Sequence, residues 1–257
     1  MLNTEARQQL QKVLPLDLIA TKSWLEAQGF SLHFLDNAVR NHTLLPLVAG
    51  VYVRQEMRLS WKGIVTSLQI MSDLAIHLGG LSALELEGLG HYLSIGNMPR
   101  INLYSDAPIP RWLNRIDIPA QFEWHGTRRL WPNTVMQDSK YLRQDNWLAS
   151  CPPLHYSCPE KAVLELLADV PKKISFEHAD QLMQGMSNLS PRKLDALLKA
   201  CDSIKVKRLF LWLAEKHQHA WFKHLAPDQY ELGTGKRLIA KGGRLEPTWQ
   251  ITVPKDM

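Results

Sequence analysis

The side chains best suited to recognition chemistry lie between residues 31 and 42, where polar residues recur on one side of a predicted helix. His33, Asn37, Arg40 and Asn41 follow one another at short helical spacings, which places them on neighbouring parts of a helix surface. Amide side chains pair with adenine in the major groove of DNA, and arginine pairs with guanine. The pattern therefore predicts a helix whose polar face reads base edges.

Other side chains near this helix suit the DNA backbone. Lys22 and Arg54 could neutralise phosphates, while His33 or Phe34 could contact a phosphate or a thymine methyl group. Tyr52 belongs to the hairpin that follows. The predicted DNA-binding residues are Lys22, Ser31, His33, Phe34, Asn37, Arg40, Asn41, Tyr52 and Arg54.

Three predicted helices have to position these side chains. They cover residues 3–13 (capped by Asn3 and stopped by Pro15), 18–28 and 32–42. Gly29 ends the second helix, and Ser31 caps the third. A short connection that contains glycine between two helices is typical of a helix-turn-helix.

The third helix and the segment after it complete the motif. Leu32, Leu35 and Val39 are predicted to form the buried stripe of this helix. The β-branched residues of LLPLVAGVYVRQ favour two strands, 44–47 and 51–54, joined around Ala49-Gly50. Residues 1–58 are therefore predicted to form a winged helix-turn-helix domain.

The rest of the chain, residues 59–257, reads as a larger domain of mixed helices and strands. Helices are predicted at 61–76, at 81–89 with Ser82 as cap, within 157–200 and at 206–216, where a buried strand is the alternative. Strands are predicted in INLYSD, FEWHG and NTVMQ, and around Gly242-Gly243 near the C-terminus. The fold class is therefore α+β.

Composition fits an ordinary globular protein. The 257 residues are 45% hydrophobic and 21% charged, which suits two modest domains. No apolar run reaches the length of a membrane span, and the N-terminus lacks the apolar stretch of a signal peptide. Three cysteines, an odd and sparse set, suit a reducing compartment. We therefore expect a cytoplasmic protein without a membrane partner.

The net charge of +5 and the pI of about 9.1 are mildly basic. The cationic excess lies at the C-terminal end, since residues 1–58 carry a surplus of only one positive charge. A basic surface with interleaved aromatic residues suits a nucleic-acid backbone. A solvated face or a site for an acidic protein are the alternatives. The predicted basic surface comprises Lys205, Lys207, Arg208, Lys216, Lys223, Lys236, Arg237, Lys241 and Arg244.

The segment GTGK at residues 233–236 invites comparison with a phosphate-binding P-loop. The full motif needs a glycine five residues before its second glycine and Ser or Thr after the lysine. Those positions hold Tyr230 and Arg237. We therefore interpret the segment as a turn.

Cys151, His155 and Cys158 form a C-x3-H-x2-C pattern that could bind zinc. Zinc prefers four ligands at paired short spacings, and the prolines around this pattern favour a loop. We therefore expect no metal and no cofactor.

Asp117, Asp138 and Lys140 can be aligned with a D…D-x-K nuclease pattern, in which two carboxylates hold Mg²⁺. This spacing is loose and frequent by chance. A Mg²⁺-dependent nuclease nevertheless stays an alternative function, and a protein-interaction module without DNA binding is a third.

Most of the chain resembles the AbiEi family, the antitoxin and autorepressor component of bacterial type IV toxin–antitoxin systems. The resemblance rests on TKSWLEAQGFSLHFLDNAVRNHTLLPLVAGVYVR, KAVLELLADV, SPRKLDALLKACDSIKVKRLFLWLAEKHQHAWFKHL and ELGTGKRLIAKGG. It implies a protein without catalytic activity that represses its own promoter, bound at repeated sites of double-stranded DNA. It also implies a nucleotidyltransferase-like toxin that the C-terminal domain counters, with or without direct contact. The wing tip departs from the usual pattern, because Leu47, Val48 and Ala49 stand where such wings often carry basic residues.

Overall fold

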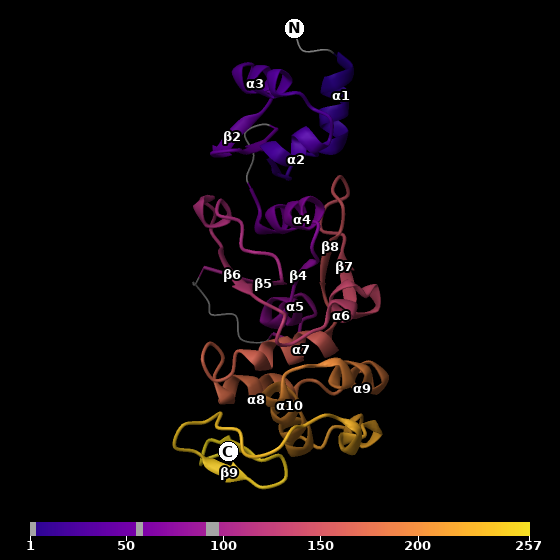
Figure 1. Ribbon diagram of the computed structural model, residues 1–257, viewed down its shortest axis with the longest axis vertical. Coiled ribbons are helices and arrows are strands. Elements are labelled where there is room, and N and C mark those ends of the chain that lie inside the picture. Colours follow the sequence, from indigo (N-terminus) through magenta and orange to yellow (C-terminus); the bar gives the residue numbers. More distant parts are fainter. Residues whose placement is uncertain (1–3, 55–58, 91–97) are drawn as a thin grey trace. The chain divides into compact units, whose positions relative to one another are not determined.

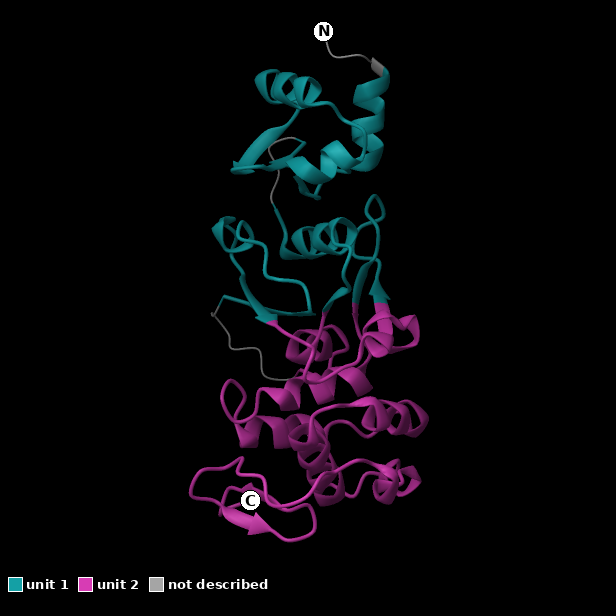
Figure 2. Ribbon diagram, viewed as in Figure 1, with its two compact units in different colours: residues 1–77, 97–124, 144–155 teal, residues 78–96, 125–143, 156–257 magenta. Residues whose placement is uncertain are grey.

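The computed structural model describes residues 4–54, 59–90 and 98–257. The chain forms two compact units (Figure 2). The first contains residues 1–77, 97–124 and 144–155, and the second contains residues 78–96, 125–143 and 156–257. The predicted domain boundary after residue 58 falls within the first unit, at a residue outside the described part, and stays a prediction.

The first unit begins with the elements expected of a winged helix-turn-helix (Figure 1). In chain order they are α1 (Thr4–Val13), β1 (Ala20–Thr21), α2 (Lys22–Ala27), α3 (Leu32–Arg40), β2 (Leu45–Val48) and β3 (Val51–Val53). The three strands form an antiparallel sheet in the order β1-β3-β2, in which Ala20 pairs with Tyr52 and Leu45 pairs with Val53. The hairpin turns at Gly50, whose φ of 76° is readily accessible to glycine.

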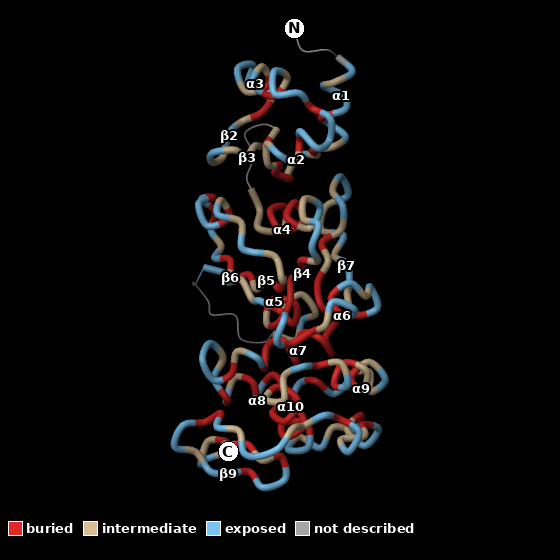
Figure 3. The backbone as a smooth tube through the Cα atoms, viewed as in Figure 1, coloured by how far each residue is buried: buried red, intermediate tan, exposed pale blue. Residues whose placement is uncertain are grey.

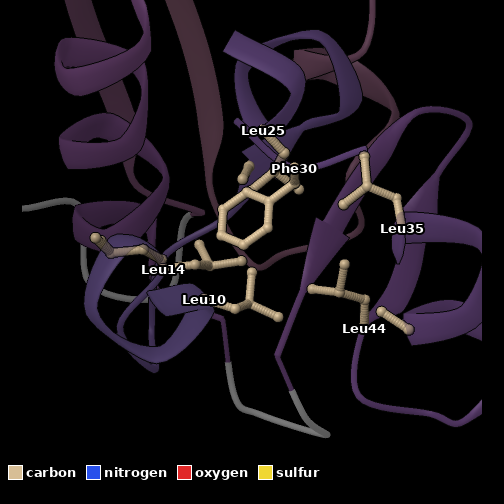
Figure 4. Packing of buried hydrophobic residues seen from close by; sticks show 9 residues of the cluster. Leu10, Leu14, Leu25, Phe30, Leu35 and Leu44 are labelled. Atoms are coloured by element: carbon tan, nitrogen blue, oxygen red, sulfur yellow. The ribbon is translucent and has the colours of Figure 1, made fainter. Parts of the chain in front are cut away.

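One apolar cluster holds these elements together (Figure 4). Its members come from every helix of this part and from the segments between them, so that burying one side of each element closes a single core. The cluster consists of Leu10, Leu14, Leu18, Ala20, Leu25, Phe30, Leu35, Ala38 and Leu44.

Three local predictions for this part need comment. The helix predicted from residue 18 begins only at Lys22, because Thr21 caps it through Oγ1 and Ala20–Thr21 pair with β3 instead. Leu32 is 52% exposed, and Ala38 is buried in its place. The predicted cap Asn3 lies outside the described residues.

The first unit continues with α4 (Trp61–Met71), which Ser60 caps by accepting the Gly63 amide. The Ile19 amide donates to Ser67 Oγ (2.9 Å), and both residues are buried. The predicted helix 61–76 ends early, since Ile76 belongs to a strand. A five-stranded sheet has the order β6-β5-β4-β8-β7. Its strands are β4 (Ile76–Leu78), β5 (Arg100–Ser105), β6 (Gln121–His125), β7 (Leu142–Asp145) and β8 (Leu154–Ser157).

Helices dominate the second unit. They are α5 (Gly80–Leu86), α6 (Asn133–Gln137), α7 (Pro159–Ala168), α8 (Phe176–Gln184), α9 (Pro191–Ala200) and α10 (Ile204–Lys216). Helix α7 packs against α5, α8, α9 and α10, and every residue from Pro159 to Leu167 is buried (Figure 3). The C-terminal hairpin of β9 (Arg244–Glu246) and β10 (Ile251–Val253) packs on α10.

The structure corrects two predictions here and decides a third. The segment NTVMQ forms α6 and not a strand, and Ser82 lies buried inside α5, which begins after Gly79. The segment KRLFLWL is helical, within α10. Short 3-10 turns occur at Leu113–Arg115, Ser139–Tyr141, Phe222–His224 and Pro227–Gln229. The α+β fold class is confirmed. None of the described helices combines the length and apolar composition that crossing a bilayer would require.

Candidate nucleic-acid interface

Helix α3 is fixed at its start and along one side. Ser31 Oγ accepts a hydrogen bond from the Phe34 amide (3.2 Å), which satisfies a free donor of the first turn. Leu35 and Ala38 are buried in the core cluster. With these residues turned inward, the opposite face of α3 is directed to solvent.

This outer face carries the predicted polar residues. His33 and Arg40 are exposed, and Asn37 between them is half-buried. Asn37 Nδ2 lies 2.9 Å from His33 Nε2, within hydrogen-bonding distance. Among the described residues Arg40 has no ion pair and no side-chain hydrogen bond, so its guanidinium is available to a ligand. Asn41 is exposed as well and ends the helix.

An acidic residue on the same face escaped the sequence analysis. Asp36 Oδ1 lies 3.9 Å from Lys22 Nζ, and the two side chains are 59% and 38% exposed. Exposed pairs of this kind contribute only about 0–1 kcal/mol, so Lys22 can leave Asp36 for a phosphate at small cost. Leu32, also exposed, adds an apolar group near the start of α3. The spacing of Asp36 from His33 and Arg40 would have identified it.

Phe34 and Tyr52 serve the protein interior as well as its surface. Both are half-buried and pack against the core cluster. The Phe34 ring stacks on Phe30, with 5.3 Å between ring centroids. Only the outer parts of these two side chains are therefore accessible to DNA.

Arg54 is committed to a structural contact. Its Nη1 donates to the carbonyl oxygens of Gln11 (3.3 Å) and Leu14 (3.0 Å) at the end of α1. Burial lowers the pKa of this guanidinium. A phosphate contact by Arg54 would fall to its remaining N–H groups.

The predicted basic C-terminal surface is smaller than the sequence suggests. Lys207 and Arg208 are 2% and 4% exposed, so the prediction that they belong to a surface is wrong. Both lie on α10 among residues that pack inward. Lys205 Nζ donates to the carbonyl oxygens of Ala168 and Val170, and burial lowers its pKa.

The remaining cations of this set reach solvent to different extents. Lys216 is exposed but pairs with Asp180 (2.9 Å). Arg244 Nη2 donates to the Met257 carbonyl oxygen. Arg237 is half-buried. The exposed cations outside α10 are Lys223, Lys236, Lys241 and Arg244.

Trp221, one of the aromatic residues interleaved with these cations, does not offer a stacking surface. Trp221 is 4% exposed and lies between Phe210 and His219, with ring centroids 5.7 and 5.0 Å away. Its indole N–H donates to the Met186 carbonyl oxygen (2.8 Å). Because nucleobases stack on accessible rings, the expected interleaving of aromatic residues with charge does not make a nucleic-acid platform at Trp221.

The residues of the zinc pattern are engaged individually. Burial raises the pKa of the Cys158 thiol to about 12, which opposes the thiolate form that zinc requires. Cys151 Sγ lies 3.4 Å from the Leu16 carbonyl oxygen, and His155 Nε2 lies 3.1 Å from Gln144 Nε2. Within the described ranges, no group of three or more His, Cys, Asp or Glu side chains is arranged to hold a metal ion.

The residues of the nuclease pattern likewise have local roles. Asp138 Oδ1 accepts the Lys140 amide (3.0 Å), and its Oδ2 pairs with Lys140 Nζ (2.8 Å). The hydrogen bond from the Lys140 side chain lowers the pKa of Asp138. This pair caps a short 3-10 turn, and Asp117 is exposed.

Comparison with known proteins yields two family matches that together cover nearly the whole chain. A family described as the N-terminal domain of the AbiEi antitoxin, a transcriptional regulator, matches residues 3–95. A family described as the AbiEi antitoxin, a transcriptional regulator of a type IV toxin–antitoxin system, matches residues 98–254. No curated protein matches significantly.

Among solved structures, the crystal structure of the RV2827C protein from Mycobacterium tuberculosis is similar, with a TM-score of 0.52 and 16% sequence identity. The match covers 96% of this chain and 89% of that chain. At this level of identity the likeness concerns the fold.

Proposed function

Because the chain belongs to the AbiEi family of antitoxins, transcriptional regulators of type IV toxin–antitoxin systems, we propose that it binds its own promoter through α3 and represses transcription. The C-terminal region counters a nucleotidyltransferase-like toxin, and the protein itself has no catalytic activity. The observation that carries the DNA-binding part is the outer face of α3, where Arg40, without an ion pair to any described residue, lies beside the pair of His33 and Asn37. This protein acts in the cytoplasm, where its promoter lies.

The chemistry of α3 suits base recognition. Arg40 has the planar fork of donors that pairs with guanine O6 and N7. Asn37 can present its amide oxygen to a base while its amide nitrogen stays bonded to His33. His33 and Asn37 therefore act as one unit. Asn41 lies one turn beyond Asn37 and extends the polar face.

Backbone contacts are fewer in this proposal than the sequence predicted. Lys22 and Asn41, at which α3 ends, supply the phosphate contacts. Arg54 contributes little to them because it is hydrogen-bonded to the end of α1. The wing tip at Leu47, Val48 and Ala49 contributes surface without charge. Affinity then depends strongly on the hydrogen bonds to bases, and removing any one of them is costly.

The decisive variant is Arg40→Ala in the full-length protein, with Arg7→Ala as its control. Arg7 is an exposed arginine of α1, so both variants lose one positive charge and only one of them alters α3. If Arg40 reads a base, its loss costs about 1–3 kcal/mol, or roughly 5- to 150-fold in affinity for the promoter. The measurement is a gel-shift titration at two salt concentrations with promoter and scrambled DNA.

The control variant and the scrambled DNA separate base recognition by Arg40 from a general effect of charge. Arg7→Ala should bind the promoter within about twofold of the parent. If a folded Arg40→Ala protein binds the promoter as tightly as the parent, α3 is not the reading element. If both variants weaken promoter and scrambled DNA equally, Arg40 contributes charge alone.

The toxin-related part is tested in cells that express the neighbouring gene's toxin. The parent and Arg40→Ala should both restore growth when supplied from an unrelated promoter, because the antitoxin role is assigned to the C-terminal region. A pull-down between the two purified proteins separates direct contact from indirect neutralisation. Failure of the parent to restore growth would remove the antitoxin assignment for that pair.

A further inference from the structure

A buried arginine shapes the exposed loop that contains the GTGK sequence. Arg208 is 4% exposed and donates four hydrogen bonds to backbone carbonyl oxygens. Its Nε reaches Leu232 (2.8 Å), Nη2 reaches Gly233 (2.9 Å), and Nη1 reaches Gly235 (2.7 Å) and Gln250 (3.1 Å). Three of the four acceptors lie within residues 232–235, so Arg208 fixes the direction of the peptide groups in and just before the loop.

That direction turns amide N–H groups toward solvent. Across a trans peptide bond, the carbonyl of one residue and the N–H of the next point in opposite directions. Since the carbonyls of Gly233 and Gly235 point to Arg208, the N–H groups of Thr234 and Lys236 point away from it. Thr234, Gly235 and Lys236 are exposed, and within the described residues their amides have no hydrogen-bond partner. Gly233 and Gly235 have φ values of 65° and 72°, which let the loop adopt this path.

The loop also carries positive charge that forms no ion pair among the described residues. Arg208 bonds only to carbonyl groups, and the side chains of Lys236 and Arg237 form no ion pair among the described residues. Arg237 lies beside the loop, since its Nη2 would be 3.6 Å from a Cβ built on Gly233. Burial and the like charge of Arg237 both lower the pKa of Arg208. Two neighbouring guanidinium groups that form no ion pair with the described carboxylates favour an anion.

The carboxylate of Glu231 already accepts a hydrogen bond from an amide of this loop. Glu231 Oε1 accepts the Gly233 amide (2.8 Å), and Glu231 is exposed. A carboxylate thus occupies the Gly233 amide, which is adjacent to the free amide of Thr234. Successive backbone amides that point to one side of a turn form the concave sites that bind phosphate in other loops.

We propose that residues 233–237 form a phosphate-binding loop, in which the amides of Thr234 and Lys236 and the side chains of Lys236 and Arg237 hold one phosphate group. The phosphate belongs either to a free nucleotide or to a nucleic-acid backbone. The loop differs from the P-loop of nucleotide hydrolases, because Arg237 stands where that motif has Ser or Thr. The proposal does not depend on promoter binding by α3.

The test compares two double variants of the full-length protein by calorimetric titration. Lys236→Ala/Arg237→Ala removes the loop cations, and Lys241→Ala/Arg244→Ala removes two neighbouring cations around the next turn. The probes are inorganic phosphate, ATP and a single-stranded oligonucleotide that lacks the promoter sequence. We expect the loop variant to lose at least tenfold in affinity and the matched control to stay within threefold. Circular dichroism melting verifies that both variants are folded.

A third variant tests the amides separately from the side chains. Glu231→Gln removes the competing negative charge, so this variant should bind phosphate at least twofold more tightly than the parent. Binding of phosphate and ATP identifies a free ligand, and binding of the oligonucleotide alone identifies a backbone phosphate.

Three results would overturn the proposal: no binding of any probe at millimolar concentration, equal losses in the two double variants, or no gain in Glu231→Gln. None of these bears on α3, because the titrations contain no promoter DNA. Loss of promoter binding by Arg40→Ala and loss of phosphate binding by the loop variant are therefore independent results.

Discussion

Replacing Gly63 by alanine sets two physical effects against each other. Gly63 lies in the first turn of α4, where alanine normally gains about 1 kcal/mol over glycine. A Cβ at this position, however, would lie 2.0 Å from the carbonyl oxygen of Asp17 and 3.1 Å from its carbonyl carbon. Ordinary carbon–oxygen contacts are about 3.3–3.6 Å, so the backbone at Asp17 would have to move by more than ~1 Å.

The steric cost should exceed the gain in helix propensity. Overpacking a buried contact costs about 1–3 kcal/mol, and the upper end applies because the obstacle is backbone that cannot rotate away. We expect Gly63→Ala to lower the free energy of unfolding by about 1–2 kcal/mol. At ~2–4 °C per kcal/mol, the melting temperature should fall by roughly 2–8 °C.

Differential scanning calorimetry is the appropriate measurement, since two compact units can unfold in separate transitions. Gly185→Ala is the control, because a Cβ there meets only the Leu182 carbonyl oxygen, at 3.6 Å. That variant should melt at or slightly above the parent temperature. If Gly63→Ala also melts at or above it, then α4 does not press against Asp17 and this packing is wrong.

Two further predictions concern a buried charged pair and the three cysteines. Glu165→Ala should lower the free energy of unfolding by about 3–5 kcal/mol in urea titration, because Lys161, Trp131 and Ser157 lose the carboxylate they share in a fully buried site. The double variant Lys161→Met/Glu165→Leu should lose less stability, since it removes both charges of the pair. Equal losses in the two variants would show that Lys161 and Glu165 are not coupled. Burial raises the pKa of Cys158 to about 12 and that of Cys201 to about 11. Alkylation of the native protein at pH 8 should therefore give a single adduct by mass spectrometry, at half-buried Cys151, and two or more adducts without denaturant would contradict this burial.

Helix α7 explains why the sequence predicted some parts of the fold and not others. Its residues Leu164, Leu167 and Ala168 recur at helical spacing, a pattern typical of an amphipathic helix with one side in solvent. The structure buries Leu164 and Leu167 but leaves Ala168 exposed, and it also buries Lys161 and Glu165 on the other side. Burial of a charged residue depends on partners distant in sequence, here the Gly80 amide and Trp131. No local periodicity encodes those interactions.

The same limit applies to the candidate interface. Ser31, Gly29 and the hairpin were predictable because caps and turns depend on a few adjacent residues. Arg54 was assigned to the DNA surface because a cation after a wing is expected there. Its hydrogen bonds to carbonyl oxygens at the end of α1 join residues 40 and 43 positions apart, which no local pattern reveals.

The number of available cations limits how the proposed repressor can bind DNA. Each phosphate that a protein neutralises contributes about −0.9 to the slope of log affinity against log salt. On and beside α3, Arg40 has no partner among the described residues and Lys22 is held only by a weak pair with Asp36, whereas Arg54 is engaged at the end of α1. Lys22, together with Arg40 where it contacts a phosphate and not a base, neutralises about one or two phosphates per protomer, which gives a shallow salt dependence and modest affinity. Tight binding to a promoter therefore requires either several protomers on repeated sites or cations that lie away from α3. In both cases the measured slope of log affinity against log salt is steeper than the slope of one protomer that binds weakly through α3 alone.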